Sequence, residues 1–93
     1  MDNIGLNSLD YRKICKICGL RLNFFPWGET GTDPTWGFCP CCGCEFGYQD
    51  FTPEAARINR VRWLSKPVWD DETQKPKDWN VEEQLKQIDP KYR

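Results

Sequence analysis

The stretch Cys39-Pro40-Cys41-Cys42-Gly43-Cys44 decides how this chain folds, together with the earlier stretch Cys15-Lys16-Ile17-Cys18-Gly19. Each contains a Cys-x-x-Cys-Gly turn, and twenty residues lie between Cys18 and Cys39. One such turn presents two thiolates along an edge of a tetrahedron, and a second turn completes the coordination of one metal ion. The glycine after each turn can adopt a positive φ, which lets backbone N–H groups point toward the sulfurs. The two turns together predict a four-cysteine metal site.

The second stretch contains two overlapping Cys-x-x-Cys pairs, Cys39 with Cys42 and Cys41 with Cys44. Only the first pair has proline after its first cysteine and glycine after its second, and the glycine matches Cys18-Gly19 in the earlier turn. The proline also stiffens this turn, because its ring fixes φ. The predicted metal ligands are therefore Cys15, Cys18, Cys39 and Cys42.

Disulfide bonds are the weaker interpretation of the six cysteines. All six lie within residues 15–18 and 39–44, which would leave residues 45–93 without a covalent link. The start of the chain has no basic segment followed by an apolar stretch, so we identify no signal peptide and expect a cytoplasmic protein. One Zn²⁺ ion is the favoured cofactor. The spacing does not exclude iron, because rubredoxin-type sites bind iron with the same four thiolates.

Cys41 and Cys44 have no role in the predicted site. The simpler interpretation is that both are small apolar residues of the core, since free cysteine is often buried. The alternative is that they form a redox pair or act as extra metal ligands, which requires exposed thiols of low pKa. A thioredoxin-like arrangement is not favoured, because no helix pattern follows the second turn.

The composition limits both the fold and the function. The 93 residues (11.0 kDa) suffice for one domain, which we place at residues 11–93 after a loose N-terminal lead-in at residues 1–10. Only 39% of the residues are hydrophobic and the mean hydropathy is −0.75, so the core needs a supplement such as a metal site. The absence of histidine excludes Ser-His-Asp and Cys-His catalysis. A formal net charge of −1 argues against a surface devoted to nucleic acid, and no apolar run reaches about 20 residues, the length of a membrane helix.

The segments around the two turns predict strands. Apolar side chains recur at alternate positions within residues 20–22, 36–38 and 46–48, as in short strands with one buried face. The second cysteine stretch would lie at the bend between the last two segments. The predicted fold class is α+β: a small zinc-ribbon-like or rubredoxin-like knuckle pair on a short antiparallel sheet, followed by two short helices.

Both helices are predicted in the second half of the chain. Thr52 is a favourable N-cap for residues 53–65, and the proline and glutamate that follow it strengthen this start. Asn80, with a glutamate three residues later, forms a capping box ahead of residues 81–88. The apolar spacing in the first helix predicts that three side chains face the core: Ile58, Val61 and Leu64.

Two groups of residues are candidates for a partner surface. The first group is aromatic and lies in the loop at residues 23–35: Phe24, Phe25 and Trp27. These rings either form an exposed platform for a partner or fold back over the metal site as part of the core. The second group is Arg57 and Arg60 in the first helix, which form either a phosphate-binding or partner patch or an ordinary solvated face.

Motifs that carry a family resemblance run through nearly the whole chain. They are Cys39-Pro40-Cys41-Cys42-Gly43, Glu45-Phe46-Gly47-Tyr48, Thr52-Pro53-Glu54-Ala55-Ala56-Arg57, Tyr11-Arg12-Lys13-Ile14-Cys15, Pro26-Trp27-Gly28-Glu29, Trp79-Asn80 and Glu82-Glu83-Gln84-Leu85. On these motifs, residues 11–88 resemble the bacterial cysteine-rich CPCC family of small proteins without an established activity. The resemblance implies that Cys44 is not a ligand, because related sequences often carry an apolar residue at that position. It leaves Cys41, which belongs to the motif that names the family, less well explained as a core filler.

The expected function is that of a non-enzymatic zinc-binding protein that acts as a protein-interaction module. Its partner would be an unknown protein, and a toxin-neutralising immunity protein is one form such a module could take. A four-cysteine site is closed to water and substrate, and the scattered carboxylates form no recognisable acid–base pair. The first alternative is thiol redox chemistry or metal handling through Cys41 and Cys44. The second alternative is a nucleic-acid-binding zinc ribbon, which would need a segregated basic surface.

Overall fold

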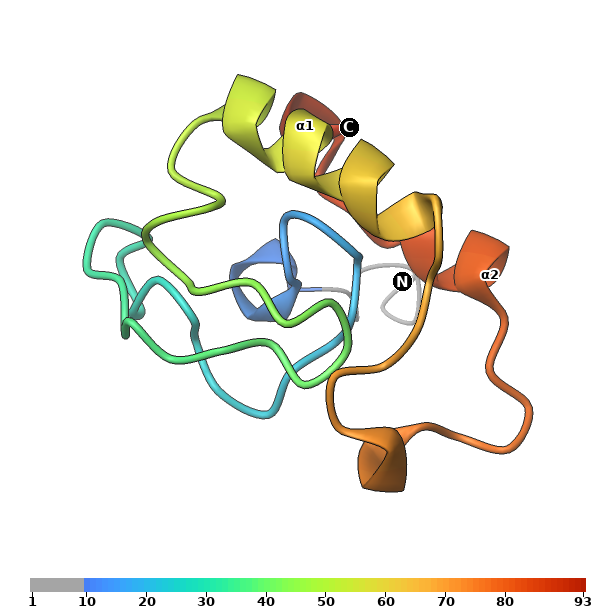
Figure 1. Ribbon diagram of the computed structural model, residues 1–93. Coiled ribbons are helices and arrows are strands. Elements are labelled where there is room, and N and C mark those ends of the chain that lie inside the picture. Colours follow the sequence, from blue (N-terminus) through green and yellow to red (C-terminus); the bar gives the residue numbers. More distant parts are fainter. Residues whose placement is uncertain (1–9) are drawn as a thin grey trace, which may run out of the picture.

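The computed structural model describes residues 10–93, and Figure 1 shows their arrangement. Two α-helices are present, α1 (Pro53–Leu64) and α2 (Val81–Leu85). Single turns of 3-10 helix occur at η2 (Tyr11–Lys13), η3 (Glu72–Gln74) and η4 (Pro90–Tyr92). Helix α1 lies across the loop-rich N-terminal half and packs against η4, so the C-terminus lies beside α1 (Figure 1).

The N-terminal boundary of the domain falls largely outside this description. Residues 1–9 of the predicted lead-in lie outside the described residues. Asp10, the last residue of that lead-in, is the N-cap of η2, because its carboxylate accepts a hydrogen bond from the backbone N–H of Arg12 at 3.0 Å. The same carboxylate forms an ion pair with the Arg12 guanidinium at 3.0 Å. Ordered structure therefore extends at least to Asp10.

The predicted antiparallel sheet is wrong, because residues 10–93 contain no β-strand. Only two isolated antiparallel bridges form, Ile14 with Arg21 and Phe38 with Glu45. The backbone leaves the extended conformation close to the second bridge, at Trp36 (φ +62°) and Gly47 (φ +100°). A ladder needs extended residues on both sides of a pair, so the pairing stops after one bridge. The α+β class is therefore replaced by a mainly irregular fold with two helices.

Helix α1 begins as predicted but presents a different face to the core. The Thr52 hydroxyl accepts a hydrogen bond from the backbone N–H of Ala55 at 3.0 Å, and Pro53 occupies the first helical position. The prediction that Ile58, Val61 and Leu64 face the core is wrong, since Ile58 is 54% exposed and Val61 is 69% exposed. The buried residues of α1 are Ala56 and Trp63.

The surface beneath α1 explains this orientation, because it presents backbone carbonyl groups beside the apolar core. The Arg60 guanidinium donates hydrogen bonds to the carbonyl oxygens of Ile17 and Lys16, both at 2.7 Å. The Asn59 amide donates to the carbonyl oxygen of Gln49 at 3.1 Å. Buried carbonyls need donors, and an apolar helix face would leave them unsatisfied. Asn59 and Arg60 therefore point inward beside the buried Ala56 and Trp63.

Three tryptophans hold the segment between the helices against the domain. The Trp69 and Trp79 rings meet edge to face with centroids 5.7 Å apart, and Trp63 and Trp79 are 6.2 Å apart. The indole N–H of Trp63 donates to the carbonyl oxygen of Val68 at 3.0 Å. Helix α2 follows with the predicted Asn80 cap, whose side-chain oxygen accepts from the N–H of Glu83 at 3.0 Å. This path brings α2 back onto the cysteine-rich half.

Candidate metal centre

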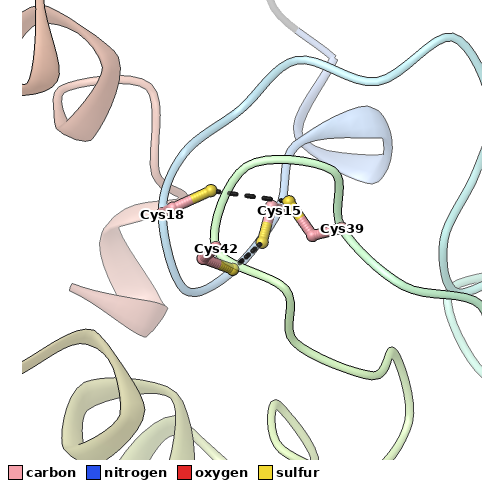
Figure 2. A group of neighbouring side chains, drawn as sticks. All are labelled: Cys15, Cys18, Cys39 and Cys42. Carbon is pink, nitrogen blue, oxygen red and sulfur yellow. Dashed lines mark hydrogen bonds between the residues drawn. The ribbon is translucent and has the colours of Figure 1, made fainter. Parts of the chain in front are cut away.

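The four predicted ligands lie together, three in the core and Cys42 packed against it, although twenty residues separate Cys18 from Cys39. Their Sγ atoms all lie within 4.8 Å of one another, and Figure 2 shows the four side chains converging. The Sγ atoms of Cys18 and Cys39 are 3.7 Å apart, and those of Cys15 and Cys42 are 3.8 Å apart. Sulfurs bound tetrahedrally at about 2.3 Å from a zinc ion would be about 3.8 Å from each other. The four cysteines can therefore hold a metal ion with little movement.

The two cysteine turns share one backbone pattern; we call residues 15–20 the first knuckle and residues 39–44 the second knuckle. In the first knuckle, the N–H of Cys15 donates to the carbonyl oxygen of Leu20, the sixth residue. The N–H of Gly19, the fifth residue, donates to the carbonyl oxygen of Cys15, and both distances are 2.9 Å. In the second, the N–H of Cys39 donates to Cys44 and that of Gly43 donates to Cys39, again at 2.9 Å. The shared pattern pairs Cys42 with Cys39 in the way that Cys18 pairs with Cys15.

A positive φ at the fifth position makes both turns possible. Gly19 has φ +85° and Gly43 has φ +75°. This left-handed region favours glycine, because a Cβ would approach the following carbonyl oxygen. The prediction that glycine supports each turn through a positive φ is confirmed at both positions.

The matching positions of the two knuckles also place the remaining cysteines. Cys41 occupies the third position, where the first knuckle has Ile17, and Cys44 occupies the sixth, where it has Leu20. Cys41 and Cys44 are both buried, and all six cysteines are free thiols. The structure therefore places both residues at positions that are apolar in the first knuckle. Cys44 still lies close to the site, with its Sγ atom 3.8 Å from that of Cys15.

Backbone carbonyls in the middle of each knuckle receive hydrogen bonds from the second half of the chain. In the first knuckle the donor is the Arg60 guanidinium described above. In the second knuckle, the N–H groups of Asp71 and Asp70 donate to Pro40 and Cys41 at 2.8 and 2.9 Å. Contacts of this kind orient metal ligands, so residues far from the cysteines in sequence fix the geometry of the site.

Helix α2 covers the first knuckle through a buried glutamine. The Gln84 side-chain amide donates to the carbonyl oxygen of Cys18 at 3.0 Å and lies 3.4 Å from the Sγ atom of Cys41. The Gln87 side chain donates to the carbonyl oxygen of Gly19 at 2.7 Å. A Cβ added at Gly19 would lie 2.2 Å from the carbonyl oxygen of Gln84. Glycine is therefore required at this position both by φ and by the close approach of α2.

The electrostatics of the cysteines favour a bound cation. Burial raises the pKa of the Cys18 thiol well above its ordinary value, and contacts with neighbouring cysteines raise it further. Burial also acts on Cys15, but hydrogen bonds from Cys18, Cys39, Cys42 and Cys44 outweigh it and lower the pKa of Cys15 well below the ordinary value. Without a cation, the four thiols could not all ionise together, because several buried like charges repel one another. A divalent ion removes this restriction by binding all four thiolates at once.

The aromatic residues predicted as a partner surface are engaged within the chain. Phe24 packs edge to face on Phe46, with ring centroids 6.0 Å apart. Phe25 lies beneath the cationic side chains of Arg12 and Lys13. The structure places both rings against the cysteine-rich half.

Trp27 and the two predicted arginines also have partners within the chain. The Trp27 indole N–H donates to the Asp50 carboxylate at 2.8 Å. Arg57 is exposed, donates to the carbonyl oxygen of Arg93 at 3.1 Å and lies 3.8 Å from the Glu54 carboxylate. The Arg60 guanidinium donates its hydrogen bonds to the carbonyls of the first knuckle, so it stabilises the site.

Two buried polar residues are not among those predicted from the sequence. Asp50 is fully buried, and its carboxylate accepts from the Trp27 indole and from the N–H of Gly47 at 2.7 Å. Burial raises the pKa of the Asp50 carboxyl, and these two hydrogen bonds oppose that rise. No pattern in the sequence distinguishes Asp50 from other loop aspartates. Gln84 could have been found, because it lies three residues after Val81 and four before Ile88, on the core side of α2.

Comparison with known proteins gives no relative for this chain. No protein-family model, no curated protein and no solved structure matches it. Within residues 10–93, no helix has both the length and the apolar character needed to span a membrane. The functional argument therefore rests on the site itself.

Proposed function

We propose that the protein is a non-enzymatic interaction module whose fold depends on one zinc ion bound by Cys15, Cys18, Cys39 and Cys42. The observation that supports the metal ion is the convergence of four Sγ atoms within 4.8 Å on two matching knuckles. A set of four thiolates is the ligand set of closed structural zinc sites. Iron can bind the same set, and elemental analysis of the purified protein distinguishes the two metals.

The metal ion would supply much of the stability. A structural zinc site contributes on the order of 10 kcal/mol of apparent binding free energy, and small domains are stable by about 5–15 kcal/mol in total. Residues 10–93 contain only two helices and two isolated bridges, so hydrogen-bonded regular structure contributes less here than in a typical domain. Removal of the ion should therefore unfold the protein rather than loosen one loop.

Two substitutions in the second knuckle test the ligand assignment. Cys42→Ser removes a proposed ligand and should give a chain that binds no metal and shows no cooperative melting. Cys44→Ala changes a cysteine two residues away and should keep one ion with a small loss of stability, because the matching position in the first knuckle holds Leu20. Elemental analysis and thermal melting by circular dichroism measure both effects. Full metal content and native melting in Cys42→Ser would show that the assignment is wrong.

A non-enzymatic role is supported by the chemistry of the site. Four thiolates fill a tetrahedral ion, so no position is left for a water or a substrate. Among the described residues, Asp50 is the one buried carboxylate, and both of its oxygens accept hydrogen bonds from within the fold. Neither group has the partner that general acid–base chemistry requires.

The outward face of α1 supports the role in protein interaction. Ile58 and Val61 are more than half exposed, and Leu64 continues the same face. Large apolar side chains at helical spacing on an exposed face are typical of surfaces that dock another protein. This face replaces the aromatic loop as the proposed partner surface, because Phe24, Phe25 and Trp27 contact other parts of the chain.

A matched pair of variants tests this surface. In Ile58→Ser/Val61→Ser the exposed apolar face is removed, and melting should change little because neither side chain is in the core. Val68→Ser removes a similarly exposed apolar side chain outside α1 and is the control. The proposal predicts that immobilised wild type and Val68→Ser both retain a partner protein from an extract of the source cells. The immobilised double variant should not retain it. Retention of the same proteins by all three would refute it.

Thiol chemistry is the second candidate function, because the Sγ atom of Cys44 lies 3.8 Å from that of the proposed ligand Cys15. A hydroperoxide could oxidise these two thiols to a disulfide, forming an alcohol and water and removing one metal ligand. Under this function, peroxide would release the metal from the wild type faster than from Cys44→Ala. Equal rates of metal release would contradict thiol chemistry and support only the structural role.

A further inference from the structure

A cavity of about 350 Å³ lies beside the first knuckle, between η2, the loop that contains Trp27 and η4. Its volume falls within the range of small-molecule sites, about 300–1,000 Å³. Three cationic side chains and a single carboxylate line it: Arg12, Lys16, Lys91 and Asp89. The carboxylate of Asp89 accepts the N–H of Lys91 at 3.1 Å as the N-cap of η4. The wall of the cavity is therefore positively charged.

Lys16 is the central cation of this wall. Its ammonium nitrogen lies 3.9 Å from the centroid of the Trp27 ring and 4.5 Å from that of Tyr92, so two rings hold it in place. Within residues 10–93, no carboxylate lies within ion-pair distance of this nitrogen. The buried Asp50 carboxylate, which accepts from the Trp27 indole, interacts electrostatically with Lys16 but forms no ion pair with it. Cation–π contacts fix a charge without neutralising it. An anion that enters the cavity would meet an oriented positive charge.

The other two cations differ in their availability. Arg12 is occupied, because its guanidinium pairs with Asp10 and donates to the carbonyl oxygen of Glu29 at 3.0 Å. Lys91 lies 5.8 Å from the Tyr92 ring centroid and, in the described part of the chain, forms no ion pair. The charge available to a ligand is therefore that of Lys16 and Lys91.

The remaining wall offers a ring and two hydroxyl groups. Tyr11 is 41% exposed and, among the rings in residues 10–93, has no stacking partner. The hydroxyls of Thr30 and Thr32 lie 2.8 Å apart at the cavity. Hydroxyl groups both donate and accept hydrogen bonds, and an exposed tyrosine ring can stack on a planar group. The cavity thus combines an anion site, a stacking surface and polar groups for hydroxyls or ring edges.

We propose that this cavity binds a mononucleotide, with its phosphate at Lys16 and Lys91 and its base against Tyr11. Phosphate supplies the anion, a base supplies the planar group, and a ribose supplies hydroxyls for Thr30 and Thr32. This site is separate from the proposed metal centre, although Lys16 lies within the first knuckle and depends on its fold. Binding at the cavity is therefore measured on metal-loaded protein, and metal content is determined separately.

Isothermal titration calorimetry of the metal-loaded full chain tests this site with adenosine monophosphate as the probe. Saturable binding is expected, and adenosine or inorganic phosphate alone should bind at least about tenfold more weakly, because each satisfies only part of the cavity. Lys16→Gln should weaken binding at least about tenfold, and Lys16→Arg should restore most of it. The control is Lys75→Gln, whose ammonium lies 5.4 Å from the Trp79 ring and does not line the cavity. This variant should change the affinity less than about twofold.

Three results would overturn the proposal. The first is the absence of saturable binding of adenosine monophosphate. The second is an equal affinity of wild type and Lys16→Gln for it. The third is binding of a single-stranded oligonucleotide by a protein that does not bind the mononucleotide. An oligonucleotide that competes with adenosine monophosphate for the cavity supports it, since each of its nucleotides carries the same chemistry. Melting and metal content are measured for each variant. If Lys16→Gln does not fold, Lys91→Gln gives the same test from outside the knuckle, with an expected loss of at least about threefold.

Discussion

Gly19→Ala probes the packing of α2 on the first knuckle. An alanine Cβ would lie 2.2 Å from the carbonyl oxygen of Gln84, 3.0 Å from its carbonyl carbon and 3.1 Å from Cγ1 of Ile88. An ordinary contact of these atoms is between about 3.4 and 4 Å. The two nearest atoms belong to the backbone of Gln84, so a rotation of a side chain cannot relieve the clash. The helix would have to move by about 1 Å.

The cost has two parts. The first is the left-handed conformation at φ +85°, which costs a non-glycine residue about 1–2 kcal/mol. The second is the displacement of α2, which would weaken the hydrogen bond from Gln84 to Cys18 and expose part of the buried Ile88. A lost hydrogen bond and reduced packing add about 2–3 kcal/mol. We expect Gly19→Ala to lower the free energy of unfolding by about 3–5 kcal/mol.

Gly31→Ala is the matched control. Gly31 has φ +81°, close to that of Gly19, but a Cβ there would meet nothing within 4 Å. Its expected cost is the conformational part alone, about 1–2 kcal/mol. Gly43→Ala should fall between the two, because its Cβ would meet the side chain of Asp70 at 3.3 Å, which can move.

Urea unfolding of the metal-loaded variants, with equal free zinc in every sample, measures these differences. The contact with α2 predicts that Gly19→Ala is less stable than Gly31→Ala by at least about 1.5 kcal/mol. Equal stabilities of the two variants would refute the close packing of α2 on the first knuckle, because the two residues have nearly the same φ.

Three further changes test other parts of the structure. Arg60→Lys should lower the free energy of unfolding by about 2–3 kcal/mol, since one ammonium cannot replace the planar guanidinium on two knuckle carbonyls. Urea unfolding measures this loss. An equal loss in Arg62→Lys, at an exposed residue of the same helix, would contradict the assigned contacts. Asp50→Asn turns an acceptor oxygen into a donor toward either the Trp27 indole or the Gly47 N–H, and should cost about 1–3 kcal/mol in the same assay. Excess chelator should abolish the cooperative melting transition seen by calorimetry, and an unchanged transition would mean that the fold does not need the metal.

The knuckles could be predicted from the sequence because their structure is local. The order of cysteine, proline and glycine in Cys39–Gly43 distinguishes one register from the other, and the structure has the hydrogen bonds and the positive φ that this register requires. The caps at Thr52 and Asn80 were found for the same reason, since each cap bonds to a backbone N–H three residues away. Interactions of this range depend on a few neighbouring residues, which the sequence shows directly.

The sheet and the buried face of α1 could not be predicted because they depend on distant partners. Alternation of apolar residues cannot show that Trp36 adopts a positive φ and ends the pairing next to it. Helical spacing favoured Ile58 and Val61 as core residues, but the surface beneath α1 needs donors, and Arg60 supplies them. A hydrophobic pattern identifies the wrong face when a helix covers backbone carbonyls as well as apolar side chains.

The aromatic loop shows the same limit. A run of phenylalanine and tryptophan in a proline- and glycine-rich segment fits either a core or a partner surface. The structure places Phe24 on Phe46 and the Trp27 indole on Asp50, two contacts that join loops far apart in sequence. Neither Phe46 nor Asp50 is marked as a partner by its own sequence neighbours.

Native mass spectrometry of the freshly purified full chain, with a count of free thiols after unfolding in chelator, tests the central claim most directly. The account predicts the mass of the chain plus one zinc ion, and six free thiols once the ion is removed, since all six cysteines are reduced in the structure. A metal-free chain whose cysteines are joined in disulfides would contradict it.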